Sequence, residues 1–384
     1  MLSQEKVFET LKENGVTYFV GVPDSYLNGF CNYALKHCGN RNVITANEGN
    51  AVALAAGHFI ATKEIPLVYM QNSGEGNAVN PLASLADRDV YAIPMILLIG
   101  WRGQGNSEPN HPQHKRQGEI TTEILDDLHI PYTILEDDEE KFNLAINKAV
   151  MHCTDTRGVY ALVAPKGVMS DSDKSNIIDS TYPMSREEAI NIILDHMPKD
   201  TIYSATTGRT TRELFFLREE RNESKSRDFL NVGSMGHASS VAMGIALSAN
   251  RPVVALDGDS AAIMHMGAMT MVSTMSVPNF MHVVLNNGAH ESVGGQPSAG
   301  HLVDFTQIAE ACGYATVGHA VTNKEELIEA VEQLKDCGKA AFIDCRIHKG
   351  ISHKLPPIVF DHREAIDSLI NELNDECFER SKLK

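Results

Sequence analysis

One segment, from Arg251 to Gly295, constrains the fold of this chain more than any other. In it, the apolar run Val253–Leu256 is followed by a Met-rich stretch and by a second apolar run, Met281–Leu285. This order predicts a strand, a crossover helix and a parallel neighbouring strand. The two strands would end side by side, one at Asp259 and the other at Asn287, and open α/β sheets bind ligands at such strand ends. We therefore expect a ligand site at this edge.

Asp259 and Asn287 would offer a carboxylate and an amide carbonyl to that site. Both are hard oxygen donors of the kind that octahedral Mg²⁺ takes, and Mg²⁺ held by few protein ligands usually also carries phosphate oxygens. A diphosphate anchored by a metal ion is the interpretation that uses both side chains. The residues alone leave an alternative open, because Asp259 could cap the following helix and Asn286 with Asn287 could form a turn.

The spacing between Gly258-Asp259-Ser260 and the asparagine pair that ends at Asn287 resembles the signature of thiamine-diphosphate-dependent enzymes. Ser260 replaces the last glycine of the Gly-Asp-Gly turn, which leaves both side-chain ligands in place. The resemblance implies that Asp259, Asn287 and the main-chain oxygen of Ala289 bind Mg²⁺. It also implies that Gly258 and Ser260 lie beside the diphosphate of thiamine diphosphate.

Composition restricts the class of protein. The length of 384 residues is typical of two domains, and the net charge of −17 argues against nucleic acid or an anionic membrane surface as a partner. The seven cysteines include no Cys-x-x-Cys pair, and neither a signal peptide nor a membrane-length apolar run is present. These features predict a cytoplasmic protein with reduced thiols. An anionic substrate would need a local group of basic residues.

Short apolar runs alternate with helical patterns along the chain, which predicts parallel sheets covered on both faces. The stretch 168–184 is polar and lacks a pattern, and Ser185 with Glu188 has the spacing of a capping box. We therefore expect two doubly wound α/β domains, 1–167 and 185–384, joined by a linker at 168–184 and without a middle domain. The expected strands are Tyr18–Val22, Asn42–Thr45, Pro66–Met70, Met95–Gly100, Tyr132–Leu135, Val159–Ala164, Thr201–Ser204, Phe229–Asn231, Val253–Leu256, Met281–Leu285, Ala315–Val317 and Ala340–Cys345.

Glu48 follows an expected strand and begins a helix that is rich in alanine. Burial raises the pKa of a carboxyl group and lets it share a proton with a ligand nitrogen. The residues alone favour a simpler role, in which Glu48 interacts with the positive end of its helix. The resemblance to thiamine-diphosphate enzymes implies instead that Glu48 hydrogen-bonds N1′ of the aminopyrimidine ring and so activates the cofactor.

Two further turns of the first domain resemble the same family. Asp24 lies in Gly-Val-Pro-Asp-Ser after the first expected strand, where the family has glycine. It would face the reactive end of the cofactor and handle protons, or it would cap the helix that follows. Asn72 and Gly74 belong to a Gly-rich stretch after the third expected strand, whose glycines permit close approach of the backbone to the cofactor.

Basic residues gather after the fourth expected strand, in a Gly-, Asn- and Pro-rich segment that is typical of a loop: Arg102, His111, His114, Lys115 and Arg116. Arginine binds phosphonate or sulfonate oxygens in a planar bidentate fashion, lysine supplies a point charge, and histidine exchanges protons near neutral pH. The alternative is a solvated loop with scattered charges. We expect the group to bind the charged end of an anionic substrate, with His114 also able to transfer protons.

Two loops of the second domain are candidate phosphate sites, because each lies at a helix start where backbone N–H groups have no helical partner. The first contains Thr207 and Gly208, and the second contains Met235, Gly236 and His237. The second loop lacks the Gly-x-Gly spacing of a dinucleotide fingerprint. Both match positions at which thiamine-diphosphate enzymes hold the diphosphate and the pyrimidine.

The order of these motifs, with no third domain between them, resembles the short thiamine-diphosphate-dependent 2-oxoacid decarboxylases that act on phosphonopyruvate or sulfopyruvate. The resemblance implies covalent catalysis by the cofactor, with Mg²⁺, and release of CO₂ from a small polyanionic 2-oxoacid. In that family the cofactor lies between the first domain of one subunit and the second of another, so at least a homodimer is expected. Two alternatives stay open: a cofactor-binding protein without decarboxylase activity, and a carboligase.

Overall fold

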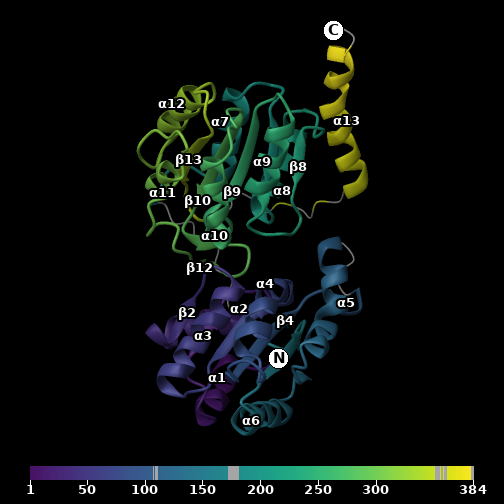
Figure 1. Cartoon of the computed structure of the whole chain (residues 1–384), viewed down its shortest axis with the longest axis vertical. Coiled ribbons are helices and arrows are strands. Elements are labelled where there is room, and N and C mark those ends of the chain that lie inside the picture. Colours follow the sequence, from purple (N-terminus) through teal and green to yellow (C-terminus); the bar gives the residue numbers. More distant parts are fainter. Residues whose placement is uncertain are drawn as a thin grey trace. The chain divides into compact units, whose positions relative to one another are not determined.

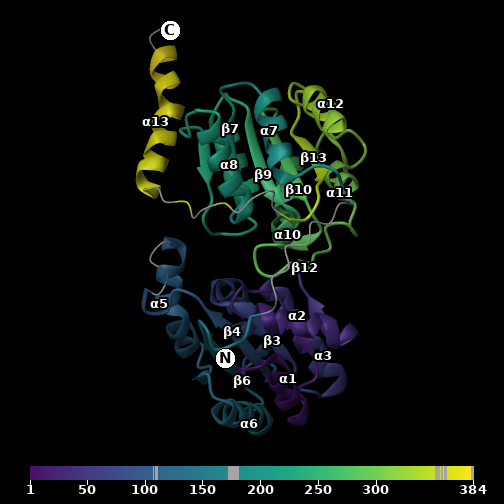
Figure 2. The ribbon, with the colours of Figure 1, turned by 180° about the vertical axis from the view of Figure 1, so that it is seen from behind.

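The computed structural model describes residues 1–106, 108, 111–171, 181–350, 355, 358 and 361–381. Most of the predicted linker, 172–180, lies outside these residues. The chain divides into two compact units. Unit 1 contains Met1–Ser175 with His290–Gln296, and unit 2 contains Asn176–Ala289 with Pro297–Lys384. The helices and the sheet of each unit are seen from opposite sides in Figure 1 and Figure 2.

Unit 1 is built on a six-stranded parallel sheet with the strand order β2-β1-β3-β4-β6-β5. Its strands are β1 (Phe19–Gly21), β2 (Asn42–Ile44), β3 (Leu67–Gln71), β4 (Met95–Trp101), β5 (Tyr132–Ile134) and β6 (Val159–Pro165). Its helices are α1 (Gln4–Glu13), α2 (Asn28–His37), α3 (Glu48–Thr62), α4 (Glu75–Pro81), α5 (Pro112–Asp127) and α6 (Glu139–Thr156). The strands predicted for this half of the chain are all present.

Apolar side chains of these strands alternate between the two faces of the sheet, so unit 1 has a core on each face. Helices α1, α2 and α6 cover one face, where Phe8 and Phe142 share a core with Tyr69 of β3. Helices α3, α4 and α5 cover the other face, where Val52 shares a core with Met70 of β3. Strand β4 is buried at every position, as expected for a parallel strand that is covered on both sides.

Unit 2 is built on a five-stranded parallel sheet with the order β13-β10-β9-β7-β8. Its strands are β7 (Ile202–Ala205), β8 (Asp228–Leu230), β9 (Val253–Gly258), β10 (Phe280–Asn286) and β13 (Ala341–Arg346). The short strands β11 (Ala289–His290) and β12 (Gln296–Pro297) pair apart from this sheet, and each has one residue in either unit. Its helices are α7 (Arg186–His196), α8 (Arg209–Glu220), α9 (Ala238–Ser248), α10 (Asp259–Met264), α11 (Phe305–Ala311), α12 (Lys324–Leu334) and α13 (His362–Ser381). The predicted capping box is present, since Ser185 and Glu188 exchange hydrogen bonds at the start of α7.

The sheet of unit 2 is also covered on both faces. Helices α7, α8 and α12 share one core with the sheet, and α9, α10, α11 and α13 share the other. Strands β9 and β10 are parallel neighbours with Gly258 opposite Leu285, which confirms the pairing that the sequence predicts. The last residues of these two strands therefore lie at the same edge of the sheet.

Two features of unit 2 differ from prediction. The predicted strand Ala315–Val317 makes only one parallel bridge, from Ala315 to Ala341, because the chain then turns away at Gly318, where φ is 81°. The Thr316 hydroxyl accepts a hydrogen bond from the Gly318 N–H in this turn. The Met-rich crossover is not one helix, because α10 ends at Met264 and a separate 3₁₀ segment covers Met266–Ser273.

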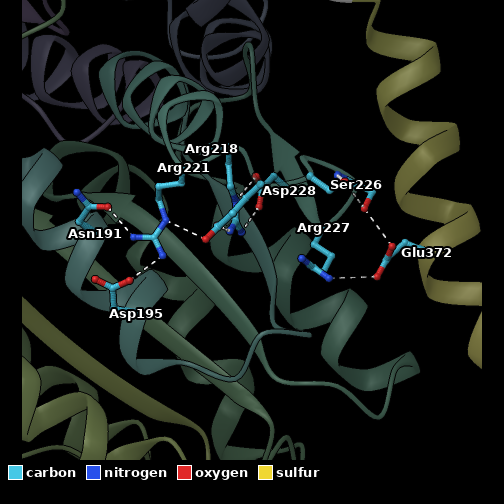
Figure 3. A network of polar contacts seen from close by, with 10 residues as sticks. Asn191, Asp195, Arg218, Arg221, Ser226, Arg227, Asp228 and Glu372 are labelled. Atoms are coloured by element: carbon cyan, nitrogen blue, oxygen red, sulfur yellow. Dashed lines mark hydrogen bonds and ion pairs between the residues drawn. The ribbon is translucent and has the colours of Figure 1, made fainter.

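Strand β8 forms one edge of the unit 2 sheet, and ionic contacts hold it there (Figure 3). The buried Asp228 accepts two hydrogen bonds from the Arg218 guanidinium of α8, each at 2.9 Å. Glu372 of α13 pairs with Arg227 at 3.6 Å and with Arg251 at 3.0 Å. Helix α13 contacts β8 and runs beside it (Figure 1), so it covers an edge that could otherwise pair with another chain.

Candidate active site

The carboxyl edge of the unit 1 sheet carries four of the predicted site residues. Asp24 follows β1, Glu48 follows β2, Asn72 follows β3 and Arg102 follows β4. The strand order β2-β1-β3-β4 makes these four strands neighbours, and parallel strands all end at the same edge. The residues therefore come together at the edge where open α/β sheets bind ligands.

Glu48 is the first residue of α3, and Asn47 caps that helix by accepting a hydrogen bond from the Asn50 N–H at 2.9 Å. The Glu48 side chain is buried, and its carboxylate accepts a hydrogen bond from Asn77 Nδ2 at 2.7 Å. Burial raises the pKa of Glu48, and the Asn77 hydrogen bond opposes this. A carboxyl group held in this way keeps its proton to a higher pH and can share that proton with a ring nitrogen.

Replacing Gly74 by Ala is expected to displace the Glu48 carboxylate. A Cβ at Gly74 would lie 2.4 Å from Glu48 Oε1, which is far inside van der Waals contact. We expect kcat to fall about 10- to 100-fold, because a misplacement on the order of 1 Å has that effect on catalytic groups. Gly76→Ala is the matched control, since its Cβ would meet nothing within 4 Å. Equal kcat values for the two variants would contradict this prediction.

Asp24 is fully buried at the end of β1. Its carboxylate accepts hydrogen bonds from Gln71 Nε2 at 2.6 Å and from the Tyr26 N–H at 3.0 Å. Burial raises the pKa of Asp24, and these hydrogen bonds oppose the shift. Helix α2 has Leu27 at its N-cap position, so the alternative in which Asp24 caps this helix is wrong. Asp24 is thus a buried acid beyond the end of β1, between β2 and β3 in the sheet order.

Arg102 is held by a carboxylate that the sequence interpretation did not include. Its guanidinium donates two hydrogen bonds to Glu108, at 2.7 Å and 3.1 Å, and lies 5.3 Å from the centre of the Tyr26 ring. The side chains of Arg102 and Glu108 are 18% and 8% exposed. A planar fork of this kind binds two oxygens of a carboxylate or of a phosphonate in the same manner. Arg102 therefore already binds an oxyanion, which the chain itself supplies.

The last three residues of the predicted basic group, His114, Lys115 and Arg116, lie at the start of helix α5, which begins with a proline. Proline is well suited to this position, because the first N–H of a helix has no partner to lose. Successive helical residues point in different directions, so His114 is buried whereas Lys115 and Arg116 are exposed. Arg116 pairs with Glu119 at 2.9 Å on the helix surface. The structure does not gather Lys115 and Arg116 with Arg102.

His114 lies on the inner side of α5. Burial lowers its pKa to about 4, and the positive charge of Arg102 acts in the same direction. The imidazole is therefore neutral at pH 7, which differs from the expected group that exchanges protons near neutral pH. His111 is exposed just before α5, with its ring centre 6.0 Å from that of His114.

Asn72 uses its amide group within unit 1. Its Nδ2 donates to the Arg102 carbonyl and to Thr121 Oγ1, each at 2.9 Å, and its Oδ1 accepts from the Arg102 N–H at 3.2 Å. These bonds join the ends of β3 and β4 to α5. Asn72 therefore positions the residue that follows β4, and its predicted contact with the cofactor stays a prediction.

In unit 2 the ends of β9 and β10 bring Asp259 and Asn287 to the same edge, and both side chains are buried. The Ser298 hydroxyl donates a hydrogen bond to the Asp259 carboxylate. A Cβ on Gly300 would lie 2.4 Å from Asp259 Oδ2 and 2.6 Å from Asn286 Oδ1. Side chains from the two strands thus meet around Gly300.

The oxygen donors at this edge suit Mg²⁺. Gly258 is the N-cap residue of α10 and the helix has no side-chain cap, so Asp259 does not cap it as the alternative proposed. The other part of that alternative is present, since Asn287 Oδ1 accepts a hydrogen bond from the Ala289 N–H at 3.1 Å. Among the described residues, no three His, Cys, Asp or Glu side chains gather as a metal site. An ion here would take one carboxylate with amide and carbonyl oxygens, which is the kind of sparse protein set that Mg²⁺ accepts.

Two hydroxyls at the same edge are buried without a hydrogen-bond partner among the described residues: Thr206, after β7, and Ser260, in α10. Buried polar atoms are nearly always paired, so these hydroxyls fit a ligand with oxygen atoms. Thr207 and Gly208 follow directly and are partly buried. Gly208 has a φ of 102° and stands at the N-cap of α8 without a side-chain cap. The first predicted phosphate loop is therefore at a helix start, as expected.

The second predicted phosphate loop precedes α9 and packs against a histidine. Met235 is partly buried, Gly236 is buried with a φ of 85°, and His237 is exposed. A Cβ on Gly236 would lie 2.6 Å from the ring of His265, whose centre is 4.3 Å from that of His237. A glycine is thus needed for this close approach.

Residues 2–128 match the thiamine pyrophosphate enzyme N-terminal TPP binding domain, and residues 214–345 match the C-terminal TPP binding domain. The phosphonopyruvate decarboxylase of Streptomyces viridochromogenes is 32% identical over 83% of this chain and 81% of its own length. The chain belongs to the thiamine pyrophosphate-dependent decarboxylase family. The phosphonopyruvate decarboxylase of Streptomyces hygroscopicus is 31% identical to this decarboxylase over 86% of this chain and 84% of the relative. The sulfopyruvate decarboxylase of Methanosarcina acetivorans is 26% identical over 90% of this chain and 92% of its own length.

Family membership confirms several predictions for this decarboxylase. It has thiamine diphosphate-binding domains at both ends of the chain, and it is a decarboxylase. Its two main parallel sheets, with no domain between them in the described part of the chain, confirm the fold class. No helix in the described part of the chain is long and apolar enough to cross a membrane.

Sequence reasoning assigned no individual role to several residues that contact the candidate site, among them Asn77, Glu108 and Ser298. Asn77 lies in the Gly-rich stretch after β3, three residues after Gly74. On a helix, this spacing puts the two residues on the same face, so Asn77 could have been predicted beside the site. Glu108 lies six residues after Arg102, but it was left out because only the basic residues of this segment were considered as anion ligands. Ser298 ends the stretch 292–298, which resembles a loop that closes over the site in this family, but nothing in the stretch marks this serine as a partner of Asp259.

Proposed function

We propose that this decarboxylase converts 3-phosphonopyruvate to phosphonoacetaldehyde and CO₂. The observation that carries the proposal is the likeness to two phosphonopyruvate decarboxylases, at 32% and 31% identity over 83% and 86% of the chain. Sulfopyruvate is the second candidate substrate, because a sulfopyruvate decarboxylase is 26% identical over 90% of the chain. Both substrates carry a tetrahedral oxyanion that a guanidinium can bind in a bidentate manner.

The cofactor proposal concerns Mg²⁺ and the residues around the diphosphate. Asp259, Asn287 and the main-chain oxygen of Ala289 would hold Mg²⁺, and the Thr206 and Ser260 hydroxyls would donate to diphosphate oxygens. Thiamine diphosphate, when bound, supplies the electron sink for loss of CO₂. The other residues proposed to line the cofactor are Asn72, Gly74, Thr207, Gly208, Met235, Gly236, His237 and Gly258.

The residues of unit 1 would then bind the substrate and move protons. Glu48, whose pKa burial raises, would share its proton with the pyrimidine nitrogen. Asp24 is buried with a raised pKa and would supply the proton that replaces the lost carboxylate. Arg102 would exchange its Glu108 partner for the phosphonate of the substrate. His111, His114, Lys115 and Arg116 stay candidates for weaker contacts with that charge.

A CO₂-release assay tests the proposed function. We expect turnover of phosphonopyruvate to exceed that of sulfopyruvate and of pyruvate, and to require both thiamine diphosphate and Mg²⁺. Faster turnover of sulfopyruvate would favour the second candidate. Cofactor binding without CO₂ release from any of the three acids would contradict both, and a carboligated product with added aldehyde would indicate a carboligase.

Asp259→Asn is expected to weaken Mg²⁺-dependent binding of thiamine diphosphate by at least about 100-fold, because it removes the carboxylate among the proposed ligands. Asp200→Asn is the control, since Asp200 is exposed in the same unit. Calorimetric titration with the cofactor, with and without Mg²⁺, measures the effect. An unchanged dissociation constant for Asp259→Asn would contradict the metal assignment.

We also propose that each active site combines Glu48 of one subunit with Asp259 of another. Glu48→Gln and Asp259→Asn should each be inactive alone. After the two variants are unfolded together and refolded as a mixture, about half of the dimers are mixed and one of their two sites is intact. The mixture should therefore recover about a quarter of the wild-type rate. A mixture as inactive as its components would place both residues in one subunit's site.

A further inference from the structure

Unit 1 contains a cavity of about 770 Å³ that the decarboxylase site does not use. It lies at the amino edge of the sheet, because Ile65 precedes β3 and Ile93 precedes β4. The last turns of α3 and α6 complete it, with Phe59 from α3. Glu48 lies at the other end of α3, so the cavity is at the opposite edge from the candidate active site.

The wall of the cavity is mainly apolar, and large apolar side chains remain exposed beside it. Phe59, Ile65 and Ile93 line it, together with Ile60 and Tyr91. Ile60 is 69% exposed and Tyr91 is 67% exposed. Cavities of about 300–1,000 Å³ with apolar walls are typical small-molecule sites. Exposed large apolar side chains gathered around one indicate a surface that is covered in the working protein.

Two cations complete the lining. Lys63 ends α3 and Arg157 ends α6, and both have left-handed backbone conformations, with φ of 64° and 52°. The Arg157 guanidinium lies 5.8 Å from the centre of the Phe59 ring. Within the described part of the chain, the ion pairs of this region join other residues, such as Arg41 and Glu64. In a chain with a net charge of −17, an apolar cavity bordered by two cations is suited to an anionic ligand.

We propose that this cavity binds a small organic carboxylate with an apolar tail. The tail lies against Phe59, Ile65 and Ile93, and the carboxylate lies between the Lys63 ammonium and the Arg157 guanidinium. Burial of the tail supplies most of the affinity, and the two cations select an acid over the corresponding alcohol. The site is separate from the thiamine diphosphate site and does not depend on the proposed substrate.

Octanoate and 1-octanol are matched probes for calorimetric titration of the whole enzyme. We expect wild-type protein to bind octanoate with a dissociation constant on the order of 10–100 µM, and 1-octanol more weakly. In the double variant Lys63→Asn with Arg157→Asn, octanoate affinity should fall at least about tenfold while 1-octanol affinity is unchanged. Asparagine keeps the left-handed backbone that both positions require. Retained binding of 1-octanol also shows that the variant is folded.

The matched control is the double variant Lys12→Gln with Lys36→Gln, which neutralises exposed cations in the last turns of α1 and α2. It should bind octanoate like wild type. The proposal is overturned if wild type shows no saturable octanoate binding, or if the Lys63 and Arg157 substitutions leave that binding unchanged. It is also overturned if octanoate does not bind and Ile60→Glu dissociates the assembly in sedimentation, because a second copy of the chain then covers this surface.

Discussion

Replacing Glu48 by Gln is expected to lower kcat about 100- to 10,000-fold, which is the range that general acid–base groups contribute. Glutamine keeps the size of the side chain and can keep the hydrogen bond from Asn77 Nδ2, which is 2.7 Å from Glu48 Oε2. It cannot give up or receive the proton that a buried carboxyl with a raised pKa would share with the cofactor. The loss should therefore appear in kcat, with much smaller changes in the melting temperature and in cofactor affinity.

Glu139→Gln is the matched control for this experiment. Glu139 is likewise the first residue of a helix, α6, after a capping residue, but it is exposed. If Glu48 acted only on the positive end of its helix, the two variants would behave alike, with losses of about 0.3–1 kcal/mol in stability and normal turnover. Normal turnover by Glu48→Gln would thus favour the simpler role that the residues alone allow.

The strands are the part of the fold that the sequence predicts best. Met95–Trp101 and Phe280–Asn286 are buried at every position, so their residues are mostly apolar and both can be predicted as strands without knowledge of their neighbours. Ala315–Val317 has two apolar residues around Thr316, yet it pairs only at Ala315, because Thr316 and Gly318 form a turn. The length of a strand at the margin of a sheet depends on such local competition and on its partners.

The candidate site can be predicted as a set of strand ends but not as a set of contacts. Asp24, Glu48 and Asp259 all lie within a few residues of a strand end, and such positions follow from the alternation of strands and helices. The partners of these residues lie in distant parts of the chain, or depend on which face of a helix is buried. The tertiary fold brings Ser298 to Asp259, and His114 lies on the buried face of α5. Neither follows from composition or spacing.

Glu75 is the clearest case of a property that only the structure reveals. It begins α4 directly after Gly74, and no motif in the sequence marks it as buried. The side chain is instead 3% exposed, and neither carboxyl oxygen has a hydrogen-bond partner among the described residues. Burial raises the pKa of Glu75 to about 9. At neutral pH the folded protein therefore holds Glu75 as a neutral acid.

Because the folded chain holds this proton, its stability falls as the pH rises. The pKa of Glu75 is about 9 in the folded chain against the usual 4.5, so between these values the folded state binds the proton and the unfolded state releases it. Stability is then full below pH 4.5 and falls as the pH rises towards 9. At 1.36 kcal/mol per pH unit, the loss reaches about 3 kcal/mol at pH 7.

Glu75→Gln should remove this loss, because glutamine has a similar shape and cannot ionise. We expect the variant to be more stable than wild type by about 3 kcal/mol at pH 7 and by less than about 1 kcal/mol at pH 5. Urea unfolding at several pH values and one protein concentration measures the difference, and Glu139→Gln serves as the exposed control. A gain that is the same at every pH would mean that Glu75 acts through packing alone. No gain at pH 7 would mean that the carboxylate has a partner or water that stabilises its charge.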